Sequence, residues 1–356
     1  MELKSIKKIL VINLGGIGDV LLSLPALKAL RKFYPQAEIY GLFNYRSCDL
    51  VKGLPYFNKI VIFDIEYGGL IFFKNIFTSF KILLILRREH FDLAINMRTI
   101  VSEKSAEKMK FIFNIINPKI KAGRDTDGKG CFFDIKIPET LIGKKYEMEY
   151  DIETIKALGT DVSDKNIDFQ IVEETANKIN ELLKKEGIFA EDVLIGIHPG
   201  GMPTRRWPVE NFSKAAIEIN NIFKCKFIIT GGKDDLYLAD ELKKMAGLKM
   251  IDMTGRLDIK ELGALIKRCN VYISNDTGPM HMAAVLKTPL IAIFGPGDLT
   301  RFDPRNISGK AIVLYTKKEC SPCEKTTCDS MECLKEISAG EVVSAAKLLL
   351  HSDLLN

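Results

Sequence analysis

The feature that most constrains this chain is a repeated alternation of short, almost wholly apolar segments with longer amphipathic ones. Lys8–Asn13 is a short apolar run before a glycine-rich turn, and Val20–Phe33 then has the apolar spacing of a helix. Apolar strands that alternate with helices are typical of a parallel sheet with both faces covered. The pattern restarts at Val193 and continues to Phe294. We therefore predict an α/β protein with two Rossmann-like, doubly wound domains.

We place the first domain at residues 1–165, the second at 166–337 and a closing helix within 338–356. Two facing units of this kind create a cleft at the carboxyl ends of their strands, and a chain of 356 residues is long enough for both. The further strands that we expect are Ala37–Leu42, Lys59–Phe63, Phe91–Asn96, Val193–Ile197, Lys226–Thr230, Met250–Met253, Val271–Ile273 and Pro289–Phe294. The expected helices are Tyr150–Leu158, Val209–Asn221, Asp234–Met245, Ile259–Arg268, Pro279–Leu286 and Ser338–Leu350, with a polar loop over Gly123–Gly130.

Composition excludes several classes of protein. The residues are 47% hydrophobic and 27% charged, with a net charge of +5, and no arginine-rich tract or aromatic–basic interleaving indicates nucleic-acid binding. The charged N-terminus is not a signal peptide. Leu70–Leu86 is strongly apolar but contains Lys74 and Lys81, which argues against a spanning helix. We favour an amphipathic helix on the first sheet over a basic helix that faces a membrane.

Four of the eight cysteines are clustered near the C-terminus, at Cys320, Cys323, Cys328 and Cys333. Four thiols this close could bind a structural zinc ion, although their spacing is not that of two paired Cys-x₂-Cys motifs. A reduced cluster without metal is an equal alternative, and a disulfide formed after lysis is a third. In a reducing cytoplasm we do not expect structural disulfides.

Residues 274–281 read Ser-Asn-Asp-Thr-Gly-Pro-Met-His and follow an apolar run. A strand, a short polar turn and a Pro in the first helical turn form a phosphate site, because the first-turn amides lack partners within the helix. Asp276 would repel a bare phosphate but accepts hydrogen bonds from sugar hydroxyls, so the motif suggests a nucleotide-sugar. His281 either contacts the phosphate or bonds a backbone carbonyl within the helix.

Three other loops follow predicted strands. After the first strand, Asp19 is either a helix cap or a general base that accepts a proton from an attacking hydroxyl. After the first strand of the second domain, Arg205 and Arg206 could pair with a diphosphate or form a solvated basic turn around Trp207. In Thr230-Gly231-Gly232-Lys233-Asp234-Asp235, either aspartate could hold ribose hydroxyls or cap the next helix.

Two motifs point to functions that we reject. Gly15-Gly16-Ile17-Gly18 lacks the Gly-x-Gly-x-x-Gly spacing, so a nicotinamide site is weakly supported. Asp125-Thr126-Asp127 matches the Asp-x-Asp pattern of metal-dependent sugar transferases, but we expect it in a Gly- and Lys-rich loop and not after an apolar strand. We treat it as a chance match.

Together these loops resemble glycosyltransferase family 9, the ADP-heptose:lipopolysaccharide heptosyltransferases. The resemblance runs in order through nearly the whole chain and is weakest between about residues 64 and 150. The C-terminal cysteine pattern also fits. The matching segments are Gly16-Ile17-Gly18-Asp19-Val20 with Pro25-Ala26-Leu27, His198-Pro199-Gly200, Arg205-Arg206-Trp207-Pro208, Thr230-Gly231-Gly232, residues 274–281 and Phe294-Gly295-Pro296.

The resemblance implies a GT-B fold and a transfer with inversion that requires no metal or other cofactor. It puts Asp19 at the proposed general-base position and Arg205 where the family usually has a phosphate-binding lysine. It also implies that Asp234 lies near the ribose, Leu257 near the adenine and Asp276 at the donor sugar. The donor-binding residues that we expect are Gly16, Gly18, His198, Arg205, Arg206, Thr230, Gly231, Asp234, Leu257, Asp276, Thr277, Gly278, Pro279, Met280 and His281.

The function expected from the resemblance is transfer of a heptose-like sugar from an ADP-sugar to a lipopolysaccharide core acceptor in the cytoplasm. Because that acceptor is a lipid-linked saccharide, peripheral contact with the inner membrane is also expected. One alternative is a transferase of a different nucleotide-sugar in another surface glycan pathway. A second is a nucleotide-sugar binding protein without turnover.

Overall fold

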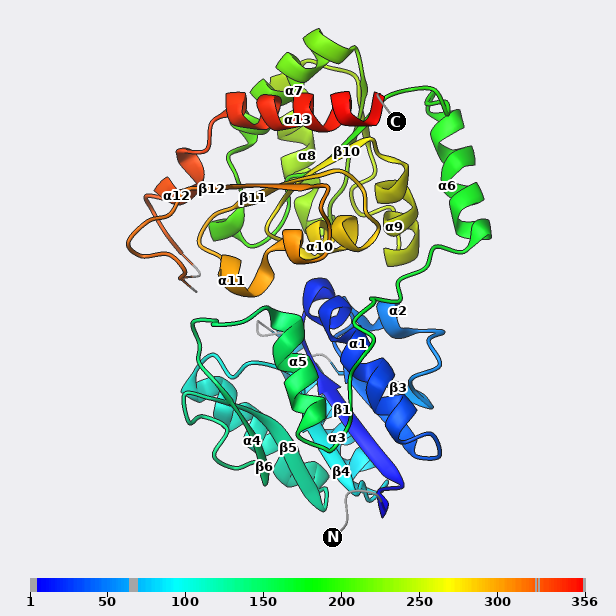
Figure 1. The fold of residues 1–356 in the computed structure, drawn as a ribbon, viewed down its shortest axis with the longest axis vertical. Helices are drawn as coiled ribbons and strands as arrows, with labels where there is room; N and C mark the ends of the chain where they lie inside the picture. Colours follow the sequence, from blue (N-terminus) through cyan, green and yellow to red (C-terminus); the bar gives the residue numbers. More distant parts are fainter. Residues whose placement is uncertain (1–4, 64–69, 324, 326, 355–356) are drawn as a thin grey trace. The chain divides into compact units, whose positions relative to one another are not determined.

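The computed structural model describes residues 5–63, 70–323, 325 and 327–354, apart from the side chains of residues 70–76 and 352–354. The chain divides into two compact units with the boundary between Asp168 and Phe169. Each unit contains a six-stranded sheet in which every pair of neighbouring strands is parallel (Figure 1). Among the described residues, no helix has the length and apolar character needed to cross a membrane.

The strands of the first unit lie in the order β3-β2-β1-β4-β5-β6. The chain therefore leaves the first strand, moves outward to one edge, and returns to build the other half of the sheet. The elements are β1 (Lys8–Asn13), α1 (Ile17–Phe33), β2 (Glu38–Phe43), α2 (Cys48–Val51), β3 (Lys59–Ile62), α3 (Leu70–Arg87), β4 (Leu93–Asn96), α4 (Glu103–Ile116), β5 (Ile120–Thr126), β6 (Ile135–Glu139) and α5 (Glu147–Lys156).

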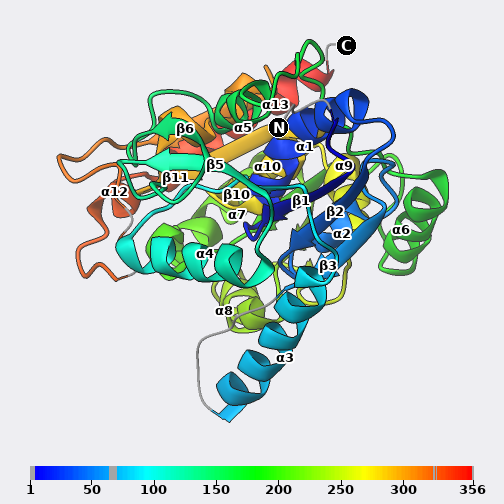
Figure 2. The same cartoon turned by 90° about the horizontal axis from the view of Figure 1, so that it is seen from below.

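Helices cover both faces of the first sheet, as apolar parallel strands require. α1 and α5 pack together on one face, and α3 and α4 lie on the other (Figure 2). On the second face, Leu10 and Ile12 of β1 share a buried cluster with Ile112 and Phe113 of α4. β1 is therefore buried from Ile9 to Asn13, and the turn that follows its carboxyl end returns to the surface at Gly16.

The second unit repeats this topology, with the strand order β12-β11-β10-β7-β8-β9. A buried cluster joins the strands to α7, α8 and α13, while α6 packs on α9. The elements are α6 (Glu173–Lys185), β7 (Leu194–His198), α7 (Val209–Phe223), β8 (Lys226–Ile229), α8 (Leu236–Ala246), β9 (Met250–Asp252), α9 (Ile259–Arg268), β10 (Val271–Asn275), α10 (Gly278–Val285), β11 (Leu290–Phe294), α11 (Leu299–Phe302), β12 (Ala311–Tyr315), α12 (Glu332–Lys335) and α13 (Ala339–Leu354); short 3₁₀ turns occupy Pro203–Arg205, Lys233–Asp235 and Pro304–Asn306.

The predicted polar loop over Gly123–Gly130 is wrong in its first half. Residues 123–126 belong to β5, which pairs with β6 in the register Arg124↔Ile137 and Asp125↔Pro138. The sequence pattern missed β5 because a buried arginine interrupts its apolar run, and it missed β6 because Pro138 and the charged residues of an edge strand disguise it.

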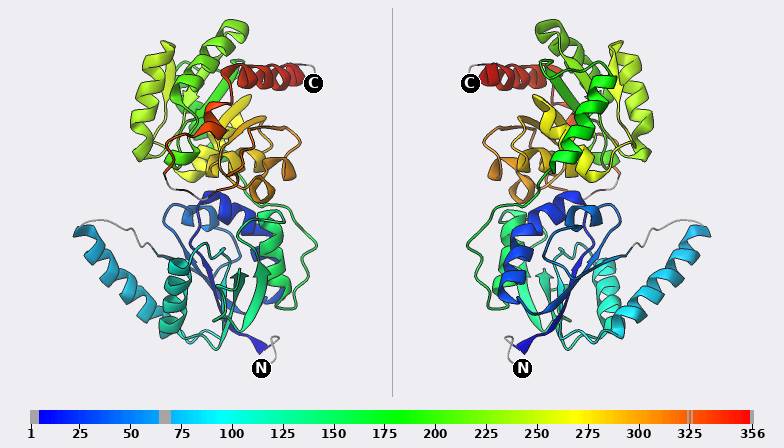
Figure 3. Two further views of the ribbon diagram at one scale, coloured as in Figure 1. Left: turned by 90° about the vertical axis from the view of Figure 1, so that its left-hand side faces the viewer. Right: turned by 90° about the vertical axis from the view of Figure 1, so that its right-hand side faces the viewer.

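The apolar segment that we predicted over Leu70–Leu86 is the helix α3. Its carboxyl-terminal half buries Leu83 and Leu86 and packs beside α4, as an amphipathic helix on the sheet would. Its amino-terminal half reaches away from the sheet of the first unit (Figure 3). The described part of α3 therefore also has a face turned away from the sheet, and packing against the sheet does not explain why that face is apolar.

Trp207 anchors the loop between β7 and α7 in the core of the second unit. Its side chain is 1% exposed, packs edge-on against Phe212, and donates from Nε1 to the carbonyl of Ile337 at 2.9 Å. Its backbone N–H donates to Asn275 Oδ1 at 3.0 Å. One residue thus connects the loop after β7, the end of β10 and the chain that enters α13.

We predict that Trp207→Phe lowers the free energy of unfolding of the second unit by about 2–3 kcal/mol, because it leaves a cavity and the Ile337 carbonyl without its donor. Urea titration followed by far-ultraviolet circular dichroism measures the change. Leu348→Ala, at a position 67% exposed on α13, is the control and should change little. Equal stability of the two variants would contradict the anchoring role.

Candidate functional site

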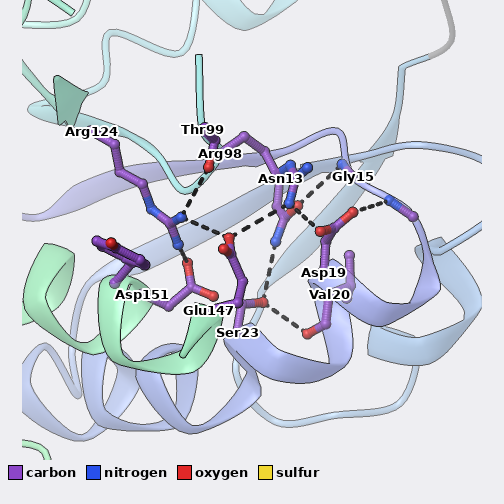
Figure 4. Close-up of polar contacts among 12 residues, drawn as sticks. Asn13, Gly15, Asp19, Val20, Ser23, Arg98, Thr99, Arg124, Glu147 and Asp151 are labelled. Carbon is purple, nitrogen blue, oxygen red and sulfur yellow. Dashed lines mark hydrogen bonds and ion pairs between the residues drawn. The ribbon is translucent and has the colours of Figure 1, made fainter. Parts of the chain in front are cut away.

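The carboxyl ends of β1 and β4 form the candidate site of the first unit. The strand order reverses between these neighbours, so their following loops diverge and leave room for a ligand. Asp19 follows β1 in the first turn of α1, and Arg98 follows β4. Their side chains form an ion pair (Figure 4).

Asp19 is held at both carboxylate oxygens. Oδ1 pairs with Arg98, and Oδ2 accepts the Gly16 N–H at 2.8 Å, so the residue does cap its helix. The side chain is nevertheless 18% exposed, which leaves it accessible to a hydroxyl. A Cβ at Gly15 would lie 2.6 Å from the Cβ of Asp19, and this turn therefore requires glycine. Of the two glycines predicted to bind donor, Gly16 is exposed and Gly18 is buried.

Arg98 was not among the predicted site residues, although the sequence contains a signal for it. Asn96, the last residue of β4, fixes the loop: its Oδ1 accepts the Arg98 N–H at 3.3 Å and its Nδ2 donates to the Arg98 carbonyl at 2.7 Å. The predicted strand Phe91–Asn96 placed Arg98 two residues beyond a strand end. Recognising β4 as the neighbour of β1 would have put Arg98 beside Asp19.

A buried ionic cluster lies behind this pair. Arg124, which is fully buried, contacts Glu139 at 3.1 Å, Glu147 at 2.7 Å and Asp151. Burial, opposed by Arg124 and reinforced by Glu147, raises the pKa of Asp151 to about 7. These four residues were not predicted as site residues, since charged residues in a sequence usually indicate surface.

In the second unit, the ends of β7 and β8 contribute His198 and Thr230. His198 Nδ1 and Thr230 Oγ1 are 3.2 Å apart, and Thr230 Oγ1 is 2.6 Å from the hydroxyl of Tyr272. Burial lowers the pKa of His198 to about 4, so the imidazole is neutral near pH 7. Both predicted residues thus lie in a buried hydrogen-bond chain beneath the loops.

Arg205 and Asp276 come together at the ends of β7 and β10. Arg205 donates to Asp276 Oδ2 at 2.9 Å, and the two side chains are 17% and 3% exposed. Gly201 has a φ of +123°, and a Cβ there would lie 2.5 Å from Thr277 Cγ2. Glycine at position 201 therefore lets the loop after β7 reach the turn before α10.

In the remaining loops, some of the predicted residues stabilise the loop and others are exposed to solvent. Arg206 donates to the Gly201 carbonyl at 2.7 Å, bonds the Tyr237 hydroxyl and pairs with Asp235 at 3.3 Å, so it braces its loop. Asp235 caps the next turn by accepting the Gly232 N–H at 2.9 Å. Asp234 is exposed and is the aspartate left to meet a ligand. Gly231 and Leu257 are half-buried at the ends of β8 and β9.

The turn at the start of α10 corrects part of the predicted phosphate site. We expected amides from Gly278 to Met280, but Pro279 has no N–H and Met280 N donates to the Thr277 carbonyl at 3.1 Å. Gly278 is therefore the residue of this turn whose amide suits an anion. Thr277 and Gly278 are half-buried, whereas Pro279, Met280 and His281 are buried, with His281 edge-on to Phe302.

The structure gives no support to a structural zinc ion. In the part of the chain that the structure describes, no group of three or more His, Cys, Asp or Glu side chains is arranged to hold a metal. All four C-terminal cysteines are free thiols, and burial and the other three thiols raise the pKa of Cys333. In the Asp125-Thr126-Asp127 segment, both carboxylates accept backbone N–H groups, from Gly130 at 2.7 Å and from Leu141 at 3.1 Å.

The chain is similar to known heptosyltransferases in sequence and in fold. The chain is 27% identical over 347 residues to the lipooligosaccharide heptosyltransferase 2 of Campylobacter jejuni, covering 94% of this chain and 96% of that protein. A family 9 glycosyltransferase of Veillonella parvula superposes with a TM-score of 0.74 and 26% identity, covering 99% of each chain. The Escherichia coli ADP-heptose lipopolysaccharide heptosyltransferase II shares the fold, with a TM-score of 0.72 and 20% identity over 97% of this chain and 99% of that one.

The fold is thus that of the GT-B heptosyltransferases, with two parallel α/β sheets. The sequence model described as glycosyltransferase family 9 (heptosyltransferase) matches residues 80–334. This match covers more than half of the chain and includes every candidate site residue from Arg98 to the C-terminal cysteines. The chain belongs to glycosyltransferase family 9, the heptosyltransferases.

Proposed function

We propose that this glycosyltransferase moves a heptose-like sugar from an ADP-sugar to a lipopolysaccharide core acceptor, with inversion and without a metal ion. The observation that carries this proposal is that the candidate base and the candidate diphosphate-binding groups belong to different units. The first holds a partly exposed carboxylate, Asp19, and the second gathers an arginine, an aspartate and a helix N-terminus at one sheet edge. The relatives named above supply the sugar and acceptor classes.

In the proposed reaction, a hydroxyl oxygen of the acceptor attacks the anomeric carbon of the donor. The bond from that carbon to the diphosphate oxygen breaks, ADP leaves, and Asp19 takes the hydroxyl proton. A single displacement of this kind inverts the anomeric centre. General-base assistance contributes a factor of about 10²–10⁴ in rate.

The second unit stabilises the leaving group in this proposal. The planar guanidinium of Arg205 suits bidentate binding of a diphosphate, and the Gly278 amide lies at the positive end of α10. Negative charge grows on the diphosphate as its bond to carbon breaks, so these donors bind the transition state better than the ground state. Asp276, beside Arg205, would accept hydrogen bonds from the donor sugar's hydroxyls.

Peripheral membrane contact is also part of the proposal, and α3 is the element that would make it. Residues one helical turn apart place four large apolar side chains on one exposed face, opposite the buried Leu83 and Leu86. These are Phe77 (74% exposed), Phe80 (44%), Leu84 (39%) and Ile85 (51%). Lys81 and Arg88 lie on the same face, and residues 77–88 include no acidic side chain. Such a surface suits an anionic bilayer.

Asp19→Asn tests the base. We expect kcat for sugar transfer to fall about 10²–10⁴-fold, because the amide cannot accept the hydroxyl proton. The dissociation constant for ADP should stay the same. Product formation is measured by mass spectrometry with a panel of ADP-, GDP-, UDP- and dTDP-sugars on a lipopolysaccharide core acceptor. Asp49→Asn changes an exposed carboxylate on α2 and serves as the control. Wild-type turnover by Asp19→Asn would refute the assignment.

Arg205→Ala tests the leaving-group site. The loss of a charge-assisted contact should weaken ADP binding about 10–100-fold, with a smaller loss for Arg205→Lys, which keeps the charge. Isothermal titration calorimetry with ADP gives the affinities. Lys249→Ala, an exposed lysine at the amino end of β9, is the matched control. An unchanged ADP affinity in Arg205→Ala would rule out the proposed contact.

The α3 surface is tested by vesicle co-sedimentation. Wild-type protein should sediment with phosphatidylglycerol-containing vesicles more than with pure phosphatidylcholine vesicles, because the face is apolar and basic. Phe77→Ser combined with Phe80→Ser should reduce this partitioning about 10–100-fold. Phe189→Ser, also at an exposed position, is the control. Equal partitioning of the double variant and wild type would remove α3 as the contact.

A further inference from the structure

The Asp19–Arg98 pair is the outer end of a connected ionic network. Arg98 is 3.8 Å from Glu147, which in turn contacts Arg124 at 2.7 Å (Figure 4). Through these contacts two guanidinium groups meet four carboxyl groups: Asp19, Glu139, Glu147 and Asp151. The network runs without a break from the exposed carboxylate to the core of the first unit.

Every member of the inner part is positioned by regular structure. Arg124 is near the end of β5, Glu139 is the last residue of β6, and Glu147 and Asp151 are one turn apart on α5. All four residues are at most 6% exposed, and Arg124 is fully buried. Replacing buried ion pairs by apolar groups is often neutral or stabilising, so stability alone is a weak reason for such a cluster.

Arg98 is held at both ends. Asn96 fixes its backbone on each side, and its guanidinium is shared between Asp19 and Glu147. A guanidinium does not lose its proton in proteins, so Arg98 cannot be the base or pass the proton on. Arg98 can instead fix the plane of the Asp19 carboxylate and place a positive charge beside it.

Glu147 reduces the effect of the Arg98 charge on Asp19. It draws on the same Nη1 group of Arg98 that meets Asp19, and Arg124 keeps Glu147 in place. A single positive charge is therefore divided between two carboxylates. Without Glu147, the whole charge of Arg98 would act on Asp19, which would become a weaker acceptor of a proton.

We propose that Arg98 is a positioning residue for Asp19, and that Glu147, anchored by the fully buried Arg124, tunes the basicity of Asp19 through Arg98. This inference rests on the proposed function, because it needs Asp19 to act as the base. It assigns to the buried cluster a role in the reaction that the packing of the first unit does not require.

The test compares Arg98→Gln, Arg98→Lys and Glu147→Gln in the full-length enzyme by the pH dependence of kcat at saturating donor and acceptor. Arg98→Gln should lower kcat about 10–100-fold through misplacement of the carboxylate, and should move the acidic limb of the profile to higher pH, because a positive charge beside the carboxylate is removed. Arg98→Lys should recover part of both. Glu147→Gln should move the limb the opposite way, to lower pH, by less.

Lys119→Ala is the matched control, because it breaks an ion pair with Asp92 at the amino end of the same sheet. The ADP dissociation constant should be the same in all variants. Opposite shifts of the acidic limb distinguish tuning from a loss of folding, which would lower activity at every pH. Arg98→Gln is at a partly exposed site and keeps the test valid if Glu147→Gln does not fold.

Two results would overturn the inference. One is an Arg98→Gln enzyme with the kcat and pH profile of wild type. The other is a change confined to the acceptor KM, which would make Arg98 a binding contact. If wild-type protein turns over and Asp19→Asn does not, either result defeats this inference while the proposed function stands. Absence of wild-type turnover with every donor defeats the proposed function itself.

Discussion

Every feature of the two sites depends on the parallel pairing of strands that are buried on both faces. Parallel strands send all of their following loops to one edge, and the order of strands reverses once within each sheet, at β1/β4 and at β7/β10. Polar side chains in these loops therefore lie close together at that edge. The ion pairs of the two sites, Asp19–Arg98 and Arg205–Asp276, are therefore set by which residues follow the strands at these two points.

At the point where the strand order reverses, each unit has an aspartate–arginine ion pair, but the two residues follow opposite strands in the two units. In the first unit the aspartate follows the first strand and the arginine follows the fourth, giving Asp19 and Arg98. In the second unit the arginine follows the first strand and the aspartate follows the fourth, giving Arg205 and Asp276. Each carboxylate is thus paired with an arginine across the gap between two loops, at a place where a bound substrate would have to compete for that arginine.

Local pattern predicted most of the apolar strands, and with them the placement of Asp19, Arg205 and Asp276 at strand ends, but it left out β12, although Ala311–Tyr315 is apolar. It failed where charge lies inside the core. Arg124 interrupts β5, and only its contacts with three buried carboxyl groups make that position tolerable. These contacts join residues far apart in sequence, so no local window reveals them. Arg98 was missed for a similar reason, because its importance comes from strand order.

The anchoring of Trp207 has an optical consequence. It is the one tryptophan of the chain, and its backbone bonds the side chain of Asn275, which also holds the carbonyls of Pro199 and Gly200 at 3.0 Å. The indole is thus attached to the loops that carry Arg205 and Asp276. Any ligand that shifts those loops changes the surroundings of the indole, so tryptophan emission from this protein, excited selectively over tyrosine, reports on its second unit.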